Sequence, residues 1–213
     1  MKTLTIFLLA VLTALPLSLP ARTVREFFAD EPGQIFAIIN RSARLDMCDY
    51  FDAGQKVSVE NLFGNGTRLD TITDLYMRLH TSETHIVEIR LMPFKSDTII
   101  AVIETALTPA PDSHITFYNR HWYRLREIKP FKAPTINDFF LSSTPKDTRR
   151  ELIAGLQFPL IEYTFTGPGF ATLEARHSLR AFLGKEVFKS YAPYMRPTLT
   201  YRIDGAKIKP LKP

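Results

Sequence analysis

The chain has 213 residues, a formal net charge of +5 at pH 7 and a 45% share of hydrophobic residues. This length allows one large domain or two small ones, each able to bury a core. Lys and Arg are spread along the chain, whereas nucleic-acid-binding proteins gather them on one stripe, so the charge argues against a nucleic-acid partner. Because Cys48 is the only cysteine, an internal disulfide is excluded, and so is a small secreted domain built on disulfides.

The first 21 residues have the pattern of a secretory signal peptide. Lys2 precedes an apolar run from Leu4 to Leu17, and the segment ends in SLPA before Arg22. The rival interpretation is a transmembrane helix, but the run is shorter than the roughly 20 apolar residues that a membrane span needs, and Pro16 interrupts it. We therefore expect residues 1–21 to be removed and the mature protein, without a transmembrane span, to reside in the periplasm or on the surface of a bacterium.

Helix-start signals occur twice in the mature chain. Thr23 is a good N-cap, and Glu26 three residues later completes a capping box ahead of two phenylalanines. The same pattern returns 112 residues later at Thr135 and Asp138, followed by Phe139 and Phe140. This recurrence suggests an internal repeat.

A second helix is predicted after each of these signals. The first covers about 42–53 and is ended by Gly54; it contains Cys48 among apolar neighbours, which favours a buried inert thiol over a nucleophile. The second covers about 144–157, with Thr144 as its cap and Asp147 completing a capping box.

The strongest structural signal is the stretch 85–125, which indicates an antiparallel sheet. Val87, Ile89 and Leu91 alternate with Glu88, Arg90 and Met92, which is the period of two expected of strands with one buried side. On this pattern the charged side chains of these strands, and Glu174 in the second half, are expected to face solvent as cross-strand pairs.

Strand patterns also recur in the second half. The segment from Leu75 resembles that from Leu160 in pattern, and each half closes on a predicted hairpin, at 115–125 and 199–211. Asp204 followed by Gly205 indicates a type I′ turn. We therefore expect an α+β fold of two tandem repeats, 22–130 and 131–213, each with two helices and a four-stranded antiparallel sheet.

The segment 55–73 has no counterpart in the second repeat. It contains the turn-forming sequence Gly64, Asn65 and Gly66, so it is expected to form a turn between two short strands. An insertion confined to one copy is a natural place for a specific function, because loops tolerate insertion and cores do not. A covering hairpin without a function of its own is the alternative.

Sequence motifs of catalysis are missing. The chain contains no GxSxG, GxxxxGK[ST] or HExxH motif and no CxxC pair. His80 and His85 are five residues apart across a predicted turn, a spacing that does not match a metal-binding helix. We expect no cofactor and no metal site.

Two functional hypotheses remain. The first is a non-enzymatic binding or scaffold protein that engages a protein or envelope component, because aromatic and arginine side chains gather on the hairpin 115–125 in a composition typical of binding patches. The candidate binding residues are Tyr118, Arg120, Trp122, Tyr123 and Arg124. The second is a hydrolase-like enzyme in which Asp112, His114 and His121 converge in a pocket.

Several motifs resemble a known family over nearly the whole mature chain. They are RLDMCDYF with AGQ, then VENLFGNG, a strand ending in LMP, and TIIAVIETALTPAPDSHITFYNRHW, of which PAPDS and FYNRHW are the most specific. The chain resembles a family of exported bacterial proteins defined only as a domain of unknown function, which implies no activity. The repeated helix, helix, sheet plan also looks like the architecture of the β-lactamase inhibitory protein, an analogy of fold that assigns no residue.

Overall fold

The chain forms an α+β fold with two antiparallel sheets, as its sequence predicted. The computed structural model describes residues 22–95, 97–126, 130–156 and 158–211, so the predicted signal peptide lies outside the described residues. The first sheet has six strands in the order β1-β2-β3-β4-β5-β6, and the second has four in the order β10-β9-β8-β7. The expected four strands in the first repeat were too few.

The first half of the chain contains two helices and the six-stranded sheet. Its elements are α1 (Val24–Ala29), α2 (Arg41–Asp52), β1 (Val59–Glu60), β2 (Gly66–Ile72), β3 (Tyr76–Ser82), β4 (His85–Phe94), β5 (Asp97–Ala106) and β6 (Asp112–Asn119).

The second half carries more helix. Its elements are η1 (Ile136–Phe139), α3 (Lys146–Ala154), β7 (Ile161–Thr166), η2 (Pro168–Phe170), β8 (Thr172–His177), α4 (Leu179–Leu183), α5 (Lys185–Tyr191), η3 (Ala192–Tyr194), β9 (Thr198–Asp204) and β10 (Lys207–Pro210).

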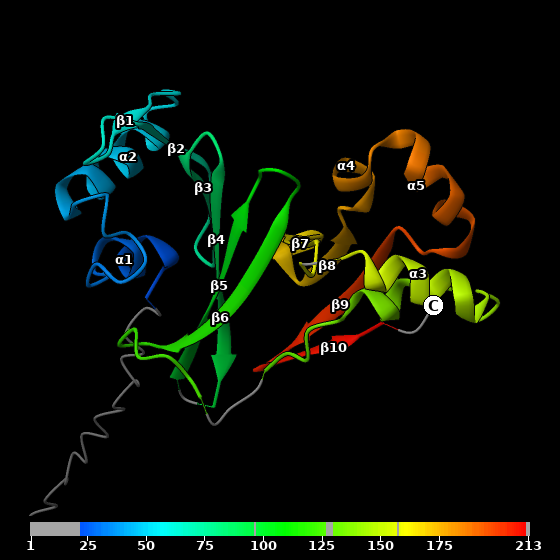
Figure 1. Cartoon of the computed structure of the whole chain (residues 1–213). Coiled ribbons are helices and arrows are strands. Elements are labelled where there is room, and N and C mark those ends of the chain that lie inside the picture. The colour runs from blue at the N-terminus through cyan, green and yellow to red at the C-terminus, as the bar shows by residue number, and fades with distance from the viewer. Residues whose placement is uncertain (1–21, 96, 127–129, 157, 212–213) are drawn as a thin grey trace, which may run out of the picture.

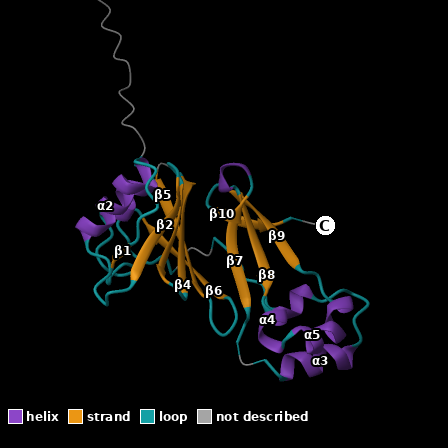
Figure 2. Ribbon diagram, turned by 90° about the horizontal axis from the view of Figure 1, so that it is seen from above, coloured by secondary structure: helices purple, strands orange, loops and turns teal. Residues whose placement is uncertain are grey.

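The first sheet is packed on both faces. Helices α1 and α2 lie over one face (Figures 1 and 2), where Phe27, Phe28 and Met47 meet Leu79 and Ile89 in one apolar core. The second sheet stands against the other face, and a second core there joins residues of both halves, including Tyr76, Ile103, Phe139, Phe165 and Leu173. The two halves therefore share apolar surface.

Glu88 and Arg90 were expected to face solvent, and the structure shows that this was wrong. Both lie on the central strand β4, and Glu88 is only 1% exposed. The Arg90 guanidinium donates to the carbonyl oxygen of Phe170 in the second half at 3.1 Å. The period of two identified the strand correctly but not its second buried face, which the second sheet covers.

The Glu88 carboxylate accepts four hydrogen bonds. The donors are the Tyr76 hydroxyl at 3.0 Å, the Arg78 guanidinium at 2.6 Å, the Thr164 hydroxyl at 2.9 Å and the Phe165 N–H at 3.0 Å. Burial raises the pKa of Glu88, and these donors oppose the rise by stabilising the charged form. Glu88 thus joins the two sheets through a fully paired buried carboxylate.

Two further side chains of the first sheet accept hydrogen bonds from the backbone of β7 in the same way. The Asp112 carboxylate accepts from the Ile161 N–H, and the Ser113 hydroxyl accepts from the Tyr163 N–H, each at 3.0 Å. With Phe165 bonded to Glu88, alternate N–H groups along the outer edge of β7 are all paired. An edge strand that would otherwise expose free donors is closed by side chains.

The helix starts followed the sequence in part. Both capping boxes form, at Thr23 with Glu26 and at Thr135 with Asp138, although the second opens a 3-10 turn and not an α-helix. Thr144 does not cap α3: its hydroxyl donates to the carbonyl oxygen of Leu141, and Pro145 occupies the N-cap.

The strand end points show further differences. The predicted hairpin 115–125 is the end of β6 followed by a tight turn, with one bridge between Tyr118 and Arg124. The hairpin 199–211 forms as β9 and β10, but its two-residue loop begins at Gly205, which alone in that loop has positive φ. Residues 179–194, for which the sequence analysis predicted no helix, contain α4, α5 and η3.

Cys48 is buried, as predicted. Desolvation raises the pKa of its thiol to about 11, so the thiol is protonated and unreactive at neutral pH. Among residues 22–211, outside the short undescribed gaps, no helix has the length and apolar character needed to cross a membrane.

Candidate functional site

The structure divides the predicted aromatic patch between core and surface. Trp122 is 3% exposed, and Tyr118 is also buried, with the two ring centroids 5.6 Å apart under α1 and α2. Tyr123, Arg120 and Arg124 are exposed. Two of the three aromatic candidates, Tyr118 and Trp122, therefore belong to the core, and binding by the three exposed residues stays a prediction.

A tight turn causes this division. The side-chain oxygen of Asn119 accepts from the N–H groups of His121 and Tyr123, and Trp122 between them has a φ of +64°. This left-handed conformation, uncommon for a bulky residue, sends consecutive side chains to opposite sides of the turn.

The structure does not bring together the three residues of the hydrolase alternative. Asp112 is engaged with the backbone of Ile161, and His114 is exposed near the start of β6. Asn119 is the last residue of β6, and at about 3.3 Å per residue it lies roughly 16 Å along the strand from His114. His121 lies beyond Asn119. That separation exceeds the reach of a hydrogen bond or a single bridging water.

Among the described residues, the hairpin of β1 and β2 carries the most exposed large apolar side chains. β1 and β2 form the short hairpin that the sequence predicted, and its turn, residues 61–65, is called here the hairpin tip. At the hairpin tip Leu62 is 69% exposed and Phe63 is 74% exposed. Burying either side chain is worth about 1.5–3 kcal/mol, so their exposure marks this surface as one able to gain from a partner.

The hairpin tip is nevertheless held in one conformation. Asn61 is buried; its side-chain oxygen accepts from the N–H groups of Phe63 and Asn65 at 2.9 and 3.2 Å, and its side-chain nitrogen donates to Thr81 in β3. The backbone of Asn61 also pairs with Asn65 and Gly64. A turn anchored in this way loses little conformational freedom on binding.

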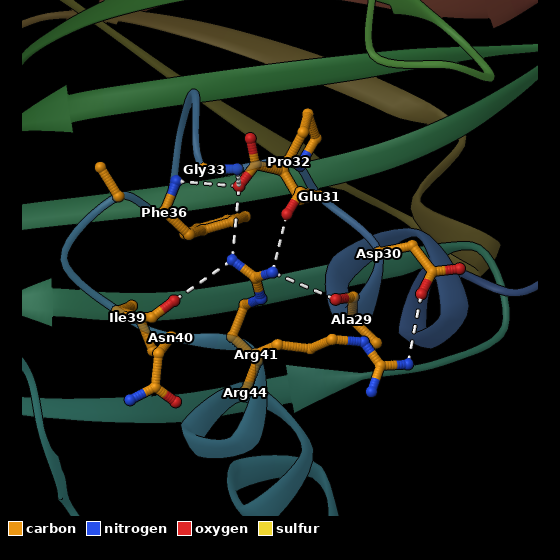
Figure 3. A pocket seen from close by; sticks show the side chains of 11 residues that line it. Ala29, Asp30, Glu31, Pro32, Gly33, Phe36, Ile39, Asn40, Arg41 and Arg44 are labelled. Carbon is orange, nitrogen blue, oxygen red and sulfur yellow. Dashed lines mark hydrogen bonds and ion pairs between the residues drawn. The ribbon is translucent and has the colours of Figure 1, made fainter.

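A second anchor ties the hairpin tip to the loop between α1 and α2. The N–H of Leu62 donates to the carbonyl oxygen of Ile38 at 2.9 Å. This loop is organised by Glu31, whose buried carboxylate accepts from the N–H groups of Gly33, Gln34, Ile35 and Phe36. Figure 3 shows the carboxylate inside the loop, facing Arg44 of α2.

Arg44 completes this buried network. Its guanidinium donates to the Glu31 carboxylate at 3.4 Å and to the carbonyl oxygens of Ile39, Ala29 and Glu31 (Figure 3). Burial lowers the pKa of Arg44, and the charge of Glu31 opposes the change. The pair therefore fixes the loop on which the hairpin tip rests.

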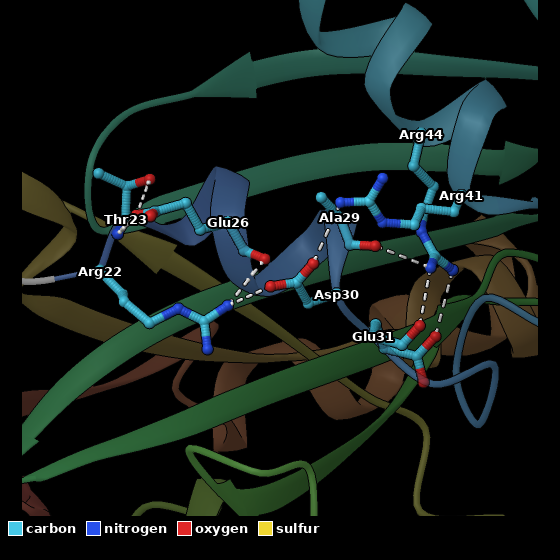
Figure 4. Close-up of polar contacts among 8 residues, drawn as sticks. All are labelled: Arg22, Thr23, Glu26, Ala29, Asp30, Glu31, Arg41 and Arg44. Carbon is cyan, nitrogen blue, oxygen red and sulfur yellow. Dashed lines mark hydrogen bonds and ion pairs between the residues drawn. The ribbon is translucent and has the colours of Figure 1, made fainter.

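A cavity of about 450 Å³ lies along the same loop. It is lined by residues from both ends of the loop, among them Pro32, Gly33, Ala37, Asn40 and Arg44. At its rim the Asp30 carboxylate binds Arg22 at 2.7 Å and Arg41 at 3.4 Å (Figure 4). These ion pairs are exposed, and such pairs contribute little stability.

Sequence reasoning identified the inserted hairpin but not its exposed residues. A Leu-Phe pair inside the turn sequence NLFGNG is a signal that could have been used, because large apolar residues are unusual among turn-forming Asn and Gly. The Glu31 and Arg44 pair carried no local signal, since the two residues are 13 positions apart and meet only through the fold.

The architecture is that of an α+β protein, and the described residues contain no group of three or more His, Cys, Asp or Glu side chains that could hold a metal ion. Comparison with known families identifies the family: the chain belongs to DUF3256, a protein family of unknown function, whose model matches residues 16–208. A solved structure, that of a domain of an uncharacterized protein from Porphyromonas gingivalis W83, is similar in fold with a TM-score of 0.75. It is 25% identical and covers 91% of this chain and 100% of its own. No curated protein matches significantly.

Proposed function

We propose that the protein is exported to the bacterial envelope and works there as a non-enzymatic binding protein whose contact surface is the hairpin tip. The observation that carries this proposal is the combination of two features at one place. Leu62 and Phe63 are more than two-thirds exposed, and the turn that presents them is pinned by Asn61 and by the bond to Ile38. The partner that fits is a protein with an apolar pocket.

Export is supported by the sequence of the first 21 residues, in which Lys2 is followed by an apolar run. The similar structure comes from Porphyromonas gingivalis, which agrees with a bacterial setting. Cleavage after Ala21 would leave Arg22 as the first residue, and the mass of the protein recovered from the envelope fraction tests this.

We also propose that the halves 22–130 and 131–213 derive from one ancestral α+β unit. Support comes from the capping boxes at Thr23 and Thr135 and from the paired strands β3 with β4 and β7 with β8. On this view the β1 and β2 hairpin is an addition to the first unit, and α4 and α5 are an addition to the second. An addition that buries little of its own apolar surface suits a recognition role.

Site-specific photocrosslinking tests the contact surface. A photoreactive phenylalanine analogue replaces Phe63 in the full-length chain, including residues 1–21, and the cells are irradiated. The expected result is one discrete adduct of defined mass. The matched control places the same analogue at Val187, which is 53% exposed on α5. No adduct at position 63, or the same adduct from both positions, contradicts the proposal.

A second variant separates positioning from contact. Asn61→Ala keeps Leu62 and Phe63 but removes the bonds that hold the turn, so crosslinking through position 63 should weaken while the fold, monitored by circular dichroism, is retained. Unchanged crosslinking in this variant would show that the anchored conformation is not needed.

A further inference from the structure

A pocket at the C-terminal end of β8, in the second sheet, is lined by more cationic than anionic side chains. It has a volume of about 440 Å³ and lies where β8 ends and α4 and α5 begin. The charged side chains that line it are Arg176, Arg180, Lys185 and Glu162. Three cations against one carboxylate give this pocket a formal charge of +2, and the pocket is remote in sequence from the hairpin tip.

Two of the cations have no acidic partner. Arg176 is paired with Glu174 at 2.7 Å, but neither Arg180 nor Lys185 forms an ion pair with any residue in the described part of the chain. The wider surroundings do not balance them, because residues 131–213 contain 13 Lys and Arg against 7 Asp and Glu. Cations without an acidic partner that line one pocket attract an anion.

Ser178 supplies a neutral donor in the same wall. The residue is 8% exposed and its N–H donates to the carbonyl oxygen of Leu160, yet its hydroxyl makes no hydrogen bond to a described residue. The hydroxyl is not among the fully buried polar atoms without a partner, so it is open to the pocket and can donate to a ligand. Next to it His177 is held between the rings of Phe139 and Phe188, and burial lowers its pKa, so it adds no positive charge at neutral pH.

We propose that this pocket binds a small phosphate-bearing ligand, with Arg180 and Lys185 pairing with the phosphate and the Ser178 hydroxyl donating to it. A guanidinium and an ammonium together match the charge and the acceptor geometry of a phosphate group. Glu162 lines the same pocket and offers an acceptor to a hydroxyl of the carrier, so the ligand class is a phosphorylated sugar or a similarly hydroxylated phosphate ester.

Calorimetric titration of the mature protein, residues 22–213, tests the proposal with glucose 6-phosphate, glucose and inorganic phosphate as probes. Glucose 6-phosphate should bind at least tenfold more tightly than glucose, and Arg180→Ala/Lys185→Ala should weaken it by about tenfold or more. The matched control is Arg202→Ala/Lys207→Ala, which removes the same charge from exposed positions in the same half and should leave the affinity within about twofold.

A further variant and a vesicle probe distinguish a soluble sugar phosphate from inorganic phosphate and from a lipid headgroup. Glu162→Gln should raise the affinity for inorganic phosphate, because a negative charge leaves the pocket. It should lower the affinity for the sugar phosphate, because the acceptor for the sugar hydroxyl is weakened. If both double variants lost the same affinity for glucose 6-phosphate, the effect would come from the net charge of the protein and not from this pocket, and the proposed site would be overturned. Binding only to phosphatidylglycerol vesicles, with no response to either soluble phosphate, would also overturn it.

Discussion

The Glu88 carboxylate accepts a hydrogen bond of 3.0 Å from the backbone N–H of Phe165, which lies 77 positions later and in the other sheet. The Glu88 carboxylate also accepts hydrogen bonds from Tyr76, Arg78 and Thr164, so one buried group of the first sheet holds part of the edge of the second. Side chains, and not backbone pairing, therefore join the sheets at this edge.

Removing the Glu88 carboxylate should destabilise the protein strongly. Glu88→Ala leaves the Phe165 N–H and the Arg78 charge without their buried partner, so the free energy of unfolding should fall by about 3–5 kcal/mol. Urea unfolding measures this. The control Glu174→Ala removes a partly exposed carboxylate paired with Arg176 and should cost about 1 kcal/mol or less. A loss of similar size in both variants would contradict the role of Glu88.

Glu31 should control the order of the loop that supports the hairpin tip. Glu31→Ala removes the acceptor of four backbone N–H groups, so the amides of residues 33–36 should exchange with deuterium at least tenfold faster. Asp30→Ala, which removes only exposed ion pairs, should leave their exchange unchanged. Protected amides in Glu31→Ala would show that the loop is held by other contacts.

His177 should make the protein less stable in mild acid. Burial lowers its pKa from the ordinary 6.5, so the unfolded chain takes up a proton more readily than the folded one. The stability this gives is present above pH 6.5 and is lost as the pH falls through the lower pKa of the folded state.

The variant His177→Phe tests this assignment. It should keep the packing against Phe139 and Phe188 and show a smaller drop in melting temperature between pH 7.5 and pH 5. His80, whose pKa is also lowered by burial, remains in the variant, so part of the drop should persist. An identical pH dependence in variant and parent would exclude His177 as a source.

Trp122 should be shielded from water. As the only tryptophan in the chain it is the sole source of indole fluorescence, and it is 3% exposed beneath the helices of the first half. Iodide should quench the folded protein weakly and the protein in guanidinium chloride strongly. Equal quenching in the two states would show that the ring is exposed to solvent in the folded protein and could belong to a binding surface.

The sequence predicted elements better than it predicted their neighbours. Periodicity located β4 and β5 and capping chemistry located α1, because both are local properties. It did not predict that Glu88 is buried, because this depends on a sheet that begins more than 70 residues later. It also gave no prediction for α4 and α5, which form between β8 and β9.

The site was predicted in the same uneven way. The segment 55–73 was singled out because the second half has no similar sequence, and the expected hairpin forms there. Trp122 was assigned to the surface because composition does not tell which way a side chain points, and that is decided by the left-handed turn after Asn119. Distances between Asp112, His114 and His121 likewise depend on where β6 ends.

The central claim is that Leu62 and Phe63 form a contact surface for a protein partner, and the most direct measurement compares the complexes that the parent chain and two variants form in the envelope. The mass of the native complex extracted from the envelope is determined for the parent, for Leu62→Ser/Phe63→Ser and for the control Val187→Ser. The account predicts one complex of defined mass in the parent and control, its loss in the double variant, and unchanged melting temperatures. A complex that persists in the double variant would contradict it.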